Sequence, residues 1–245
     1  MKQELFVIII FYMYIVFKIY YKKNKKIVIN KDYDIIYNQG GYYGFYQLGI
    51  CHYIKNNFDI SKKKSIGISA GSWLCIFMIL DKHNTNLFIK KLFSKIHYIY
   101  PIHKLFNLFE ETLNECELNN NLNYSNIHIM VSNLQDFTLD IHNNFLSFND
   151  LLKCCVSSSF IPLISYKDIF YFYRNKLVMD GGLLKRFYFV NTNAKTLEIK
   201  YDMFGRFKKN KFYKSLFKPG RSLYSLYLLG YKDAQNNHQY LKKYF

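Results

Sequence analysis

The feature that most restricts the fold of this chain is the motif GISAG at positions 67–71, in which two glycines flank a serine and which lies between two apolar segments. Residues 65–68 read as a short strand, and residues 72–81 are almost wholly apolar and predict a buried helix. Ser69 is the central residue of the turn between them. The segment therefore predicts one strand–turn–helix unit of an α/β protein.

This turn suits a nucleophile. It lifts the Ser69 hydroxyl clear of the backbone and directs it over the N-terminus of the next helix, where the helix dipole favours developing negative charge. Gly67 and Gly71 are the small neighbours that such a turn requires, because larger side chains there would collide. A Gly/Ser loop without chemistry has the same pattern, so this motif alone leaves both readings open.

A glycine-rich loop, GGYYG at 40–44, lies between a predicted strand at 33–38 and a predicted helix at 45–55. Its three glycines can present backbone N–H groups to a phosphate or to an oxyanion. They are Gly40, Gly41 and Gly44. A dinucleotide site would have a glycine where Gln39 stands, and a plain turn is the other alternative. One βαβ unit places this loop and Ser69 at the same carboxyl edge of a parallel sheet, where open α/β folds bind ligands.

A third motif, Asp180 followed by Gly181 and Gly182, comes directly after a predicted strand. An acid in a tight turn is usually a turn residue, but a nucleophilic serine needs a base within hydrogen-bond reach. The one histidine after Asp180 is His238, in a polar tail. The motif order favours a Ser69–Asp180 dyad, with a triad using His238 as the alternative.

The remaining pattern alternates strands with helices, which predicts an α/β fold with a parallel sheet. The predicted strands cover residues 26–30, 33–38, 65–68, 127–131 and 177–179. The predicted helices cover residues 45–55, 72–81, one or two segments of 86–118 broken near Pro101, and 148–157.

The N-terminal segment predicts a membrane anchor. Residues 5–17 are continuously apolar, and residues 5–21 would span ~25 Å as a helix, close to the ~30 Å hydrocarbon core. The lysines at 22–26 follow the apolar run, and no small-residue cleavage site is present, which disfavours a signal peptide. A buried core helix is the other alternative. Basic residues behind the span predict a single-pass anchor with the body on the cytoplasmic side.

The net charge of +17 is concentrated in the flanks. Residues 1–30 carry +5 and residues 200–245 carry +9, which leaves +3 for the middle. Residues 204–214 interleave basic and aromatic side chains, as in segments that bind anionic lipid or RNA, although a solvated helix is also compatible. The position of the charge favours an anionic membrane surface over a nucleic-acid partner. AT-rich codons account for part of the basicity, and the sequence does not indicate whether the protein has protein partners.

The five cysteines are odd in number and show no metal-ligand spacing. We expect no disulfide framework and no metal site, and we expect most of the thiols to be buried as small apolar groups in a reducing compartment.

Together, the three motifs resemble those of the patatin-like phospholipases, which have a glycine-rich oxyanion loop, a G-x-S-x-G turn and an Asp-Gly-Gly or Asp-Gly-Ala turn in this order. Two shorter segments are similar as well, VSNL at 131–134 and SSSFIP at 157–162. The similarity covers roughly residues 33–190. The chain departs from the family at Gln39 and Tyr43, where glycine and often a basic residue are usual.

The resemblance implies a three-layer α/β/α fold with a mostly parallel central sheet, preceded by one membrane-anchor helix. We expect an anchor with its basic flank at 1–26, an acyl hydrolase domain at 27–199 and a basic, aromatic-rich extension at 200–245. The implied activity is hydrolysis of fatty-acyl esters of phospholipids or acylglycerols, with no cofactor. Ser69 would be the nucleophile, Asp180 the proton acceptor, and the loop glycines the oxyanion site. The rival interpretation is a catalytically inactive, membrane-bound lipid-binding or scaffold protein of the same fold.

Overall fold

A computed structural model describes residues 27–29, 32–96, 101–116, 122–185, 188–190, 195–208 and 221–245. The predicted anchor at 1–26 lies outside these ranges, as does most of the basic strip at 204–214. Within the described ranges, no helix is long and apolar enough to cross a membrane.

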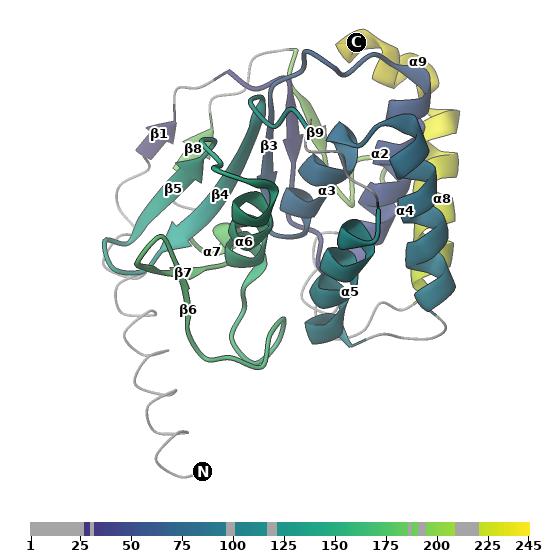
Figure 1. Ribbon diagram of the computed structural model, residues 1–245. Coiled ribbons are helices and arrows are strands. Elements are labelled where there is room, and N and C mark those ends of the chain that lie inside the picture. Colours follow the sequence, from purple (N-terminus) through teal and green to yellow (C-terminus); the bar gives the residue numbers. More distant parts are fainter. Residues whose placement is uncertain are drawn as a thin grey trace.

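The centre of the molecule is a seven-stranded mixed sheet (Figure 1). Its parallel part has the order β9, β2, β3, β4, formed by Leu197–Ile199, Ile35–Tyr37, Ser65–Ile68 and Ile127–Asn133. Its antiparallel part contains β5 (Thr138–His142), β6 (Tyr171–Tyr173) and β7 (Lys176–Met179). A separate parallel pair joins β1 (Ile27–Ile29) to β8 (Tyr188–Val190). The predicted α/β class with a mostly parallel central sheet is confirmed, and the antiparallel part was not predicted.

Helices follow the strands and cover both faces of the sheet. The longer ones are α2 (Gly44–Asn57), α3 (Ala70–Ile79), α4 (Lys82–Lys95), α5 (Ile102–Asn114), α6 (Phe148–Ser159) and α8 (Leu223–Asn236). The short ones are α7 (Gly181–Lys185), α9 (His238–Leu241) and two 3₁₀ turns at Gly41–Tyr43 and Lys242–Tyr244. The predicted helices at 45–55, 72–81, 86–118 and 148–157 are therefore confirmed, with the break at Pro101 separating α4 from α5.

The strand residues alternate between two hydrophobic cores, one on each face of the sheet. Ile35, Tyr37 and Ile129 pack with the core that contains the long helices. Their neighbours Ile36 and Met130 pack with the opposite core, which also contains Leu184 of α7. Since side chains alternate along a strand, this pattern places the long helices on one face and α7 on the other. All five cysteines are buried, which confirms the expectation for most of them, and none forms a disulfide among the described residues.

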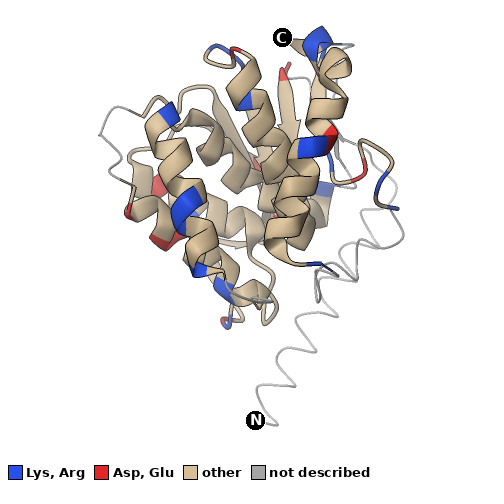
Figure 2. Ribbon diagram, turned by 90° about the vertical axis from the view of Figure 1, so that its right-hand side faces the viewer, with Lys and Arg blue, Asp and Glu red and all other residues tan. Residues whose placement is uncertain are grey.

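Helix α8, near the C-terminus, lies side by side with α2 (Figure 1). Two glycines allow the helix backbones to touch: a Cβ on Gly49 would lie 2.0 Å from the carbonyl oxygen of Tyr227, and a Cβ on Gly230 would lie 1.9 Å from that of Tyr46. Residues 221–245, which were predicted to belong to an extension, thus cover the outer side of α2. Figure 2 shows the Lys and Arg residues of this side distributed along several helices.

The segment before α8 is attached by an ion pair between the exposed Arg206 and the buried Asp233. Arg206 donates two hydrogen bonds to Asp233, with Nε–Oδ2 and Nη2–Oδ1 distances of 2.6 and 2.5 Å. The hydroxyl of Tyr46 on α2 donates to the same carboxylate at 2.8 Å. Both contacts lower the pKa of Asp233. These contacts hold one basic residue of the predicted strip on the body of the fold.

Candidate active site

Ser69 is held in a strained turn between β3 and α3. Its backbone angles are φ 55° and ψ −127°, in a sparsely populated region for a non-glycine residue, and its side chain is buried. A Cβ on Gly67 would lie 2.6 Å from Ser72 Cα, and a Cβ on Gly71 would lie 2.1 Å from the Tyr37 carbonyl oxygen. Both positions therefore require glycine, as the motif predicts.

The sheet topology brings Asp180 to this turn. On β4, Ile129 pairs with Gly67 on one side and with His142 of β5 on the other. Ser132 pairs with Met179 of β7, and β5 again occupies its other side. It follows that β3 and β7 lie along the same edge of β4 and run toward each other. Their last residues are followed directly by Ser69 and Asp180, so the two meet beside β4.

The Asp180 turn is also closely packed. The Asp180 backbone N–H donates to the Phe160 carbonyl at 2.8 Å, and its Oδ1 accepts from the Gly182 N–H at 2.7 Å. A Cβ on Gly181 would lie 2.3 Å from the Met130 carbonyl oxygen, so this turn approaches β4 closely only because position 181 is glycine. The predicted turn glycines therefore have structural roles beside the acid.

The environment of Asp180 favours a proton acceptor that titrates near neutrality. Burial raises the pKa of this carboxyl to about 6, while hydrogen bonding by the Ser69 hydroxyl and by the Gly182 N–H opposes that increase. Asp180 Oδ2 is buried and has no hydrogen-bond partner of normal distance and angle. The Asp180 carboxylate thus interacts with the Ser69 hydroxyl and has one oxygen free to accept a proton.

The glycine-rich loop borders the same turn. A Cβ on Gly44 would lie 3.1 Å from the Cβ of Ala70, the residue after Ser69. Gly41 has a φ of 51°, and a Cβ on Gly40 would lie 2.1 Å from the Gln47 side chain. The structure therefore brings together all three predicted motifs at the carboxyl ends of β2, β3 and β7.

The sequence assigned no role to two further polar residues of this region, Lys185 and Gln39. Lys185, at the end of α7, donates to the Asn38 side chain, whose amide donates to Glu198 Oε2 at 3.3 Å. Burial lowers the pKa of Lys185 to about 8. Gln39 lies against Gly182, and its Oε1 is buried without a partner. The only available signal was their adjacency to the glycine motifs, which does not reveal which side chains turn inward.

His238 is not part of this group. Its Nδ1 lies 2.9 Å from the Tyr53 hydroxyl, and its ring stacks on Phe58 with centroids 5.1 Å apart. Phe58 lines a cavity beside Ile35 and Ser65, the first residues of β2 and β3, whereas Ser69 follows the last residue of β3. The alternative triad using His238 is therefore wrong.

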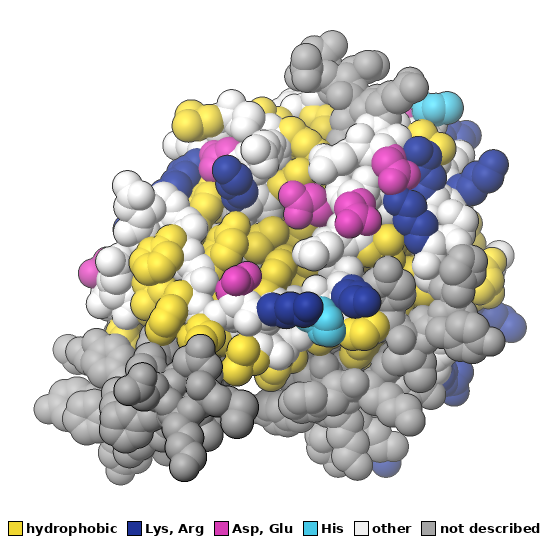
Figure 3. All heavy atoms as spheres, turned by 60° about the horizontal axis from the view of Figure 1, so that its bottom comes forward, with side chains coloured by type: hydrophobic (Ala, Val, Ile, Leu, Met, Phe, Trp, Pro, Cys, Tyr) yellow, Lys and Arg dark blue, Asp and Glu magenta, His cyan; other side chains and the backbone are white. Residues whose placement is uncertain are grey.

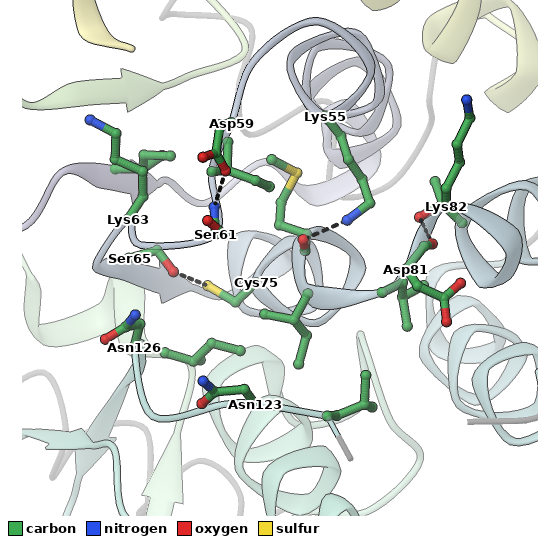
Figure 4. A pocket seen from close by; sticks show the side chains of 18 of the residues that line it. Lys55, Asp59, Ser61, Lys63, Ser65, Cys75, Asp81, Lys82, Asn123 and Asn126 are labelled. Atoms are coloured by element: carbon green, nitrogen blue, oxygen red, sulfur yellow. Dashed lines mark hydrogen bonds between the residues drawn. The ribbon is translucent and has the colours of Figure 1, made fainter. Parts of the chain in front are cut away.

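That cavity, of about 920 Å³, lies at the amino ends of the strands (Figure 4). Two of its charged groups bind helix ends. Lys55 Nζ donates to the Met78 carbonyl near the end of α3, and Asp81 accepts from the Asn84 N–H at the start of α4, at 2.6 and 2.7 Å. Carbonyls at a helix end and N–H groups at a helix start commonly take such partners. The cavity is thus separate from the Ser69 group.

The face at which β2 and β3 end carries a central group of hydrophobic side chains with charged residues around it (Figure 3).

Among the described residues, no group of three or more His, Cys, Asp or Glu side chains is placed to hold a metal ion. No protein-family model matches the chain, and no curated protein is similar to it.

Proposed function

We propose that this protein is a lipid acyl hydrolase with a patatin-like fold, which cleaves fatty-acyl esters of phospholipids or acylglycerols through Ser69 and Asp180. The proposal depends chiefly on one observation: a serine on a strained strand-to-helix turn has a buried carboxyl beside it, and the two interact. Strained backbone of this kind is characteristic of functional sites. The loop of 40–44 next to the same turn supplies the third element of the reaction.

In the proposed reaction, Ser69 Oγ attacks the ester carbonyl carbon while Asp180 accepts the hydroxyl proton. Backbone N–H groups of Gly40, Gly41 and Ala70 would donate to the resulting oxyanion, and loss of one such donor typically costs ~3 kcal/mol. Collapse of the intermediate breaks the bond to the alcohol, which leaves with the proton from Asp180. Water then attacks acyl-Ser69, its proton passes through Asp180 to Ser69 Oγ, and the fatty acid is released.

Lipid is the proposed substrate class because an apolar group of side chains occupies the face that carries the site. The predicted anchor at 1–26 and the basic flanks add to this, since both would hold the enzyme on an anionic membrane from its cytoplasmic side. The resemblance of the three motifs to the patatin-like phospholipases supports the same class.

A fluorophosphonate probe is expected to label the full-length protein at Ser69, because such probes react with activated serine hydroxyls. Mass spectrometry of the labelled peptide identifies the site. Fatty-acid release from vesicles of phosphatidylcholine and triacylglycerol measures the activity itself. Neither labelling nor release would contradict the proposal and favour the inactive lipid-binding or scaffold protein.

Ester hydrolysis is expected to increase with pH and to reach half its plateau near pH 6, because only the ionised Asp180 can accept the serine proton and burial raises its pKa to about 6. The measurement is kcat/KM for a soluble short-chain ester from about pH 3 to about pH 9. A half-maximum at the ordinary aspartate value of 3.8 would contradict this assignment.

A further inference from the structure

Ser158, in the last turn of α6, connects the nucleophile turn to the central sheet. Its Oγ accepts a hydrogen bond from the Ser69 backbone N–H at 2.9 Å and donates one to the Met130 carbonyl of β4 at 2.7 Å. We infer that Ser158 is a positioning residue, which holds Ser69 in the orientation that hydrolysis requires. This inference rests on the proposed function of Ser69.

The backbone conformation of Ser69 needs external support. Residues in sparsely populated regions persist only where the surroundings hold them. The Ser69 carbonyl accepts from the Ser72 N–H and the Ser72 hydroxyl, at 2.9 and 2.6 Å, so the helix side of the turn is fixed by α3 itself. The Ser69 N–H, on the strand side, is bound by Ser158. Ser158 therefore fixes the side of the turn that α3 does not hold.

The same short piece of β4 also holds Asp180. Ser132 Oγ donates to the Asp180 carbonyl at 2.8 Å and accepts from the Leu184 N–H at 3.2 Å. Met130, which Ser158 contacts, is two residues away on the same strand. Hydrogen bonds thus hold both the nucleophile and the acid on one short segment of β4. On the nucleophile side, Ser158 provides this connection. This gives a role to the serine-rich segment at 157–162, which the motifs alone did not explain.

The neighbouring Ser157 provides a matched control. Both serines are completely buried on α6, but Ser157 Oγ donates to the Lys153 carbonyl within the same helix, at 2.8 Å. Ser157→Ala and Ser158→Ala therefore remove the same group from adjacent buried positions. Only the second substitution breaks the connection between β4 and Ser69.

The experiment compares these two variants with wild type in the full-length protein. A displacement of about 1 Å at reacting atoms can cost ~100-fold in rate. We therefore expect Ser158→Ala to lower kcat and the rate of fluorophosphonate labelling by about 10- to 100-fold, with KM nearly unchanged and labelling still reaching one probe per protein. Ser157→Ala should remain within about twofold of wild type. Complete labelling at a reduced rate separates a positioning effect from a loss of folded protein.

Equal rates for Ser157→Ala and Ser158→Ala would overturn the inference. If Ser158→Ala does not fold, Ser158→Cys is compared with Ser157→Cys instead. A thiol fills the position of the hydroxyl but forms only weak hydrogen bonds. Ser158→Cys should label several-fold more slowly than Ser157→Cys, and equal rates would again contradict the role of Ser158. An inactive and unlabelled wild type would instead contradict the proposed function itself.

Discussion

Replacement of Ser69 by alanine or of Asp180 by asparagine is expected to lower ester hydrolysis by at least ~10³-fold, because each removes one half of a unit that works together. Ser69→Ala removes the attacking oxygen, and fluorophosphonate labelling should disappear with it. Asp180→Asn preserves the shape of the side chain but leaves no group that can accept the serine proton. The measurements are fatty-acid release from vesicles and the labelling rate.

Two substitutions serve as controls. Ser65→Ala removes a buried hydroxyl from the amino end of β3, whose contact with the Cys75 sulfur is long at 4.0 Å. Asp168→Asn neutralises an exposed carboxylate. Both variants should hydrolyse esters at nearly the wild-type rate. An Asp180→Asn enzyme that is as active as these controls would show that Asp180 is not the proton acceptor.

The Asp180→Asn variant also has a stability signature. Because burial raises the folded-state pKa of Asp180 to about 6 from 3.8, the folded protein binds this proton more tightly than the unfolded chain. The contribution to stability is complete below pH 3.8 and is lost as the pH rises through about 6. Urea unfolding should therefore show wild type losing stability across this window, whereas Asp180→Asn lacks that component. The same pH dependence in both proteins would contradict the assigned pKa.

Gly230→Ala is expected to destabilise the fold by about 3 kcal/mol or more, at the upper end for overpacked sites. The added Cβ would lie 1.9 Å from the Tyr46 carbonyl oxygen, and a backbone atom within a helix cannot move aside alone. Helices α2 and α8 would have to separate over their length, which exposes the apolar contacts between them. Gly49→Ala should have a similar effect from the other side of the contact, with a Cβ 2.0 Å from the Tyr227 oxygen. Urea-induced unfolding measures the loss for each variant.

Gly205→Ala is the control for these substitutions. Gly205 has a φ of 70°, but no atom lies within 4 Å of an added Cβ. Its replacement should cost only the ~1–2 kcal/mol of the left-handed conformation. If Gly230→Ala unfolds at the same urea concentration as Gly205→Ala, the close contact between α2 and α8 does not contribute as the geometry indicates.

Much of the local structure was predictable from residue patterns. The structure contains three strongly apolar elements that local residue patterns predict. They are the strands at 65–68 and 127–131 and the helix at 72–81. Neither the short strand β9 nor the helix α8 was predicted. For α8, the basic and aromatic composition of residues 200–245 obscured the apolar periodicity. Three-residue strands such as β9 also have too little sequence pattern to identify, and pairing with β2 defines this one.

The sequence by itself determined the pieces of the site. The glycines at 67, 71 and 181 stand out in the order of small residues along the chain. The crowding that requires Gly67 comes from nearby Ser72, whereas Gly71 and Gly181 are required by the Tyr37 and Met130 carbonyls of other strands. Only the tertiary structure decided which pieces meet. Ser69 and Asp180 are 111 positions apart in the numbering, and they come together because β3 and β7 share one edge of β4 in opposite directions. The raised pKa of Asp180, the exclusion of His238 and the contact of Ser158 with Ser69 follow from that packing. Burial and hydrogen-bond partners are properties of the assembled fold, and no local pattern specifies them.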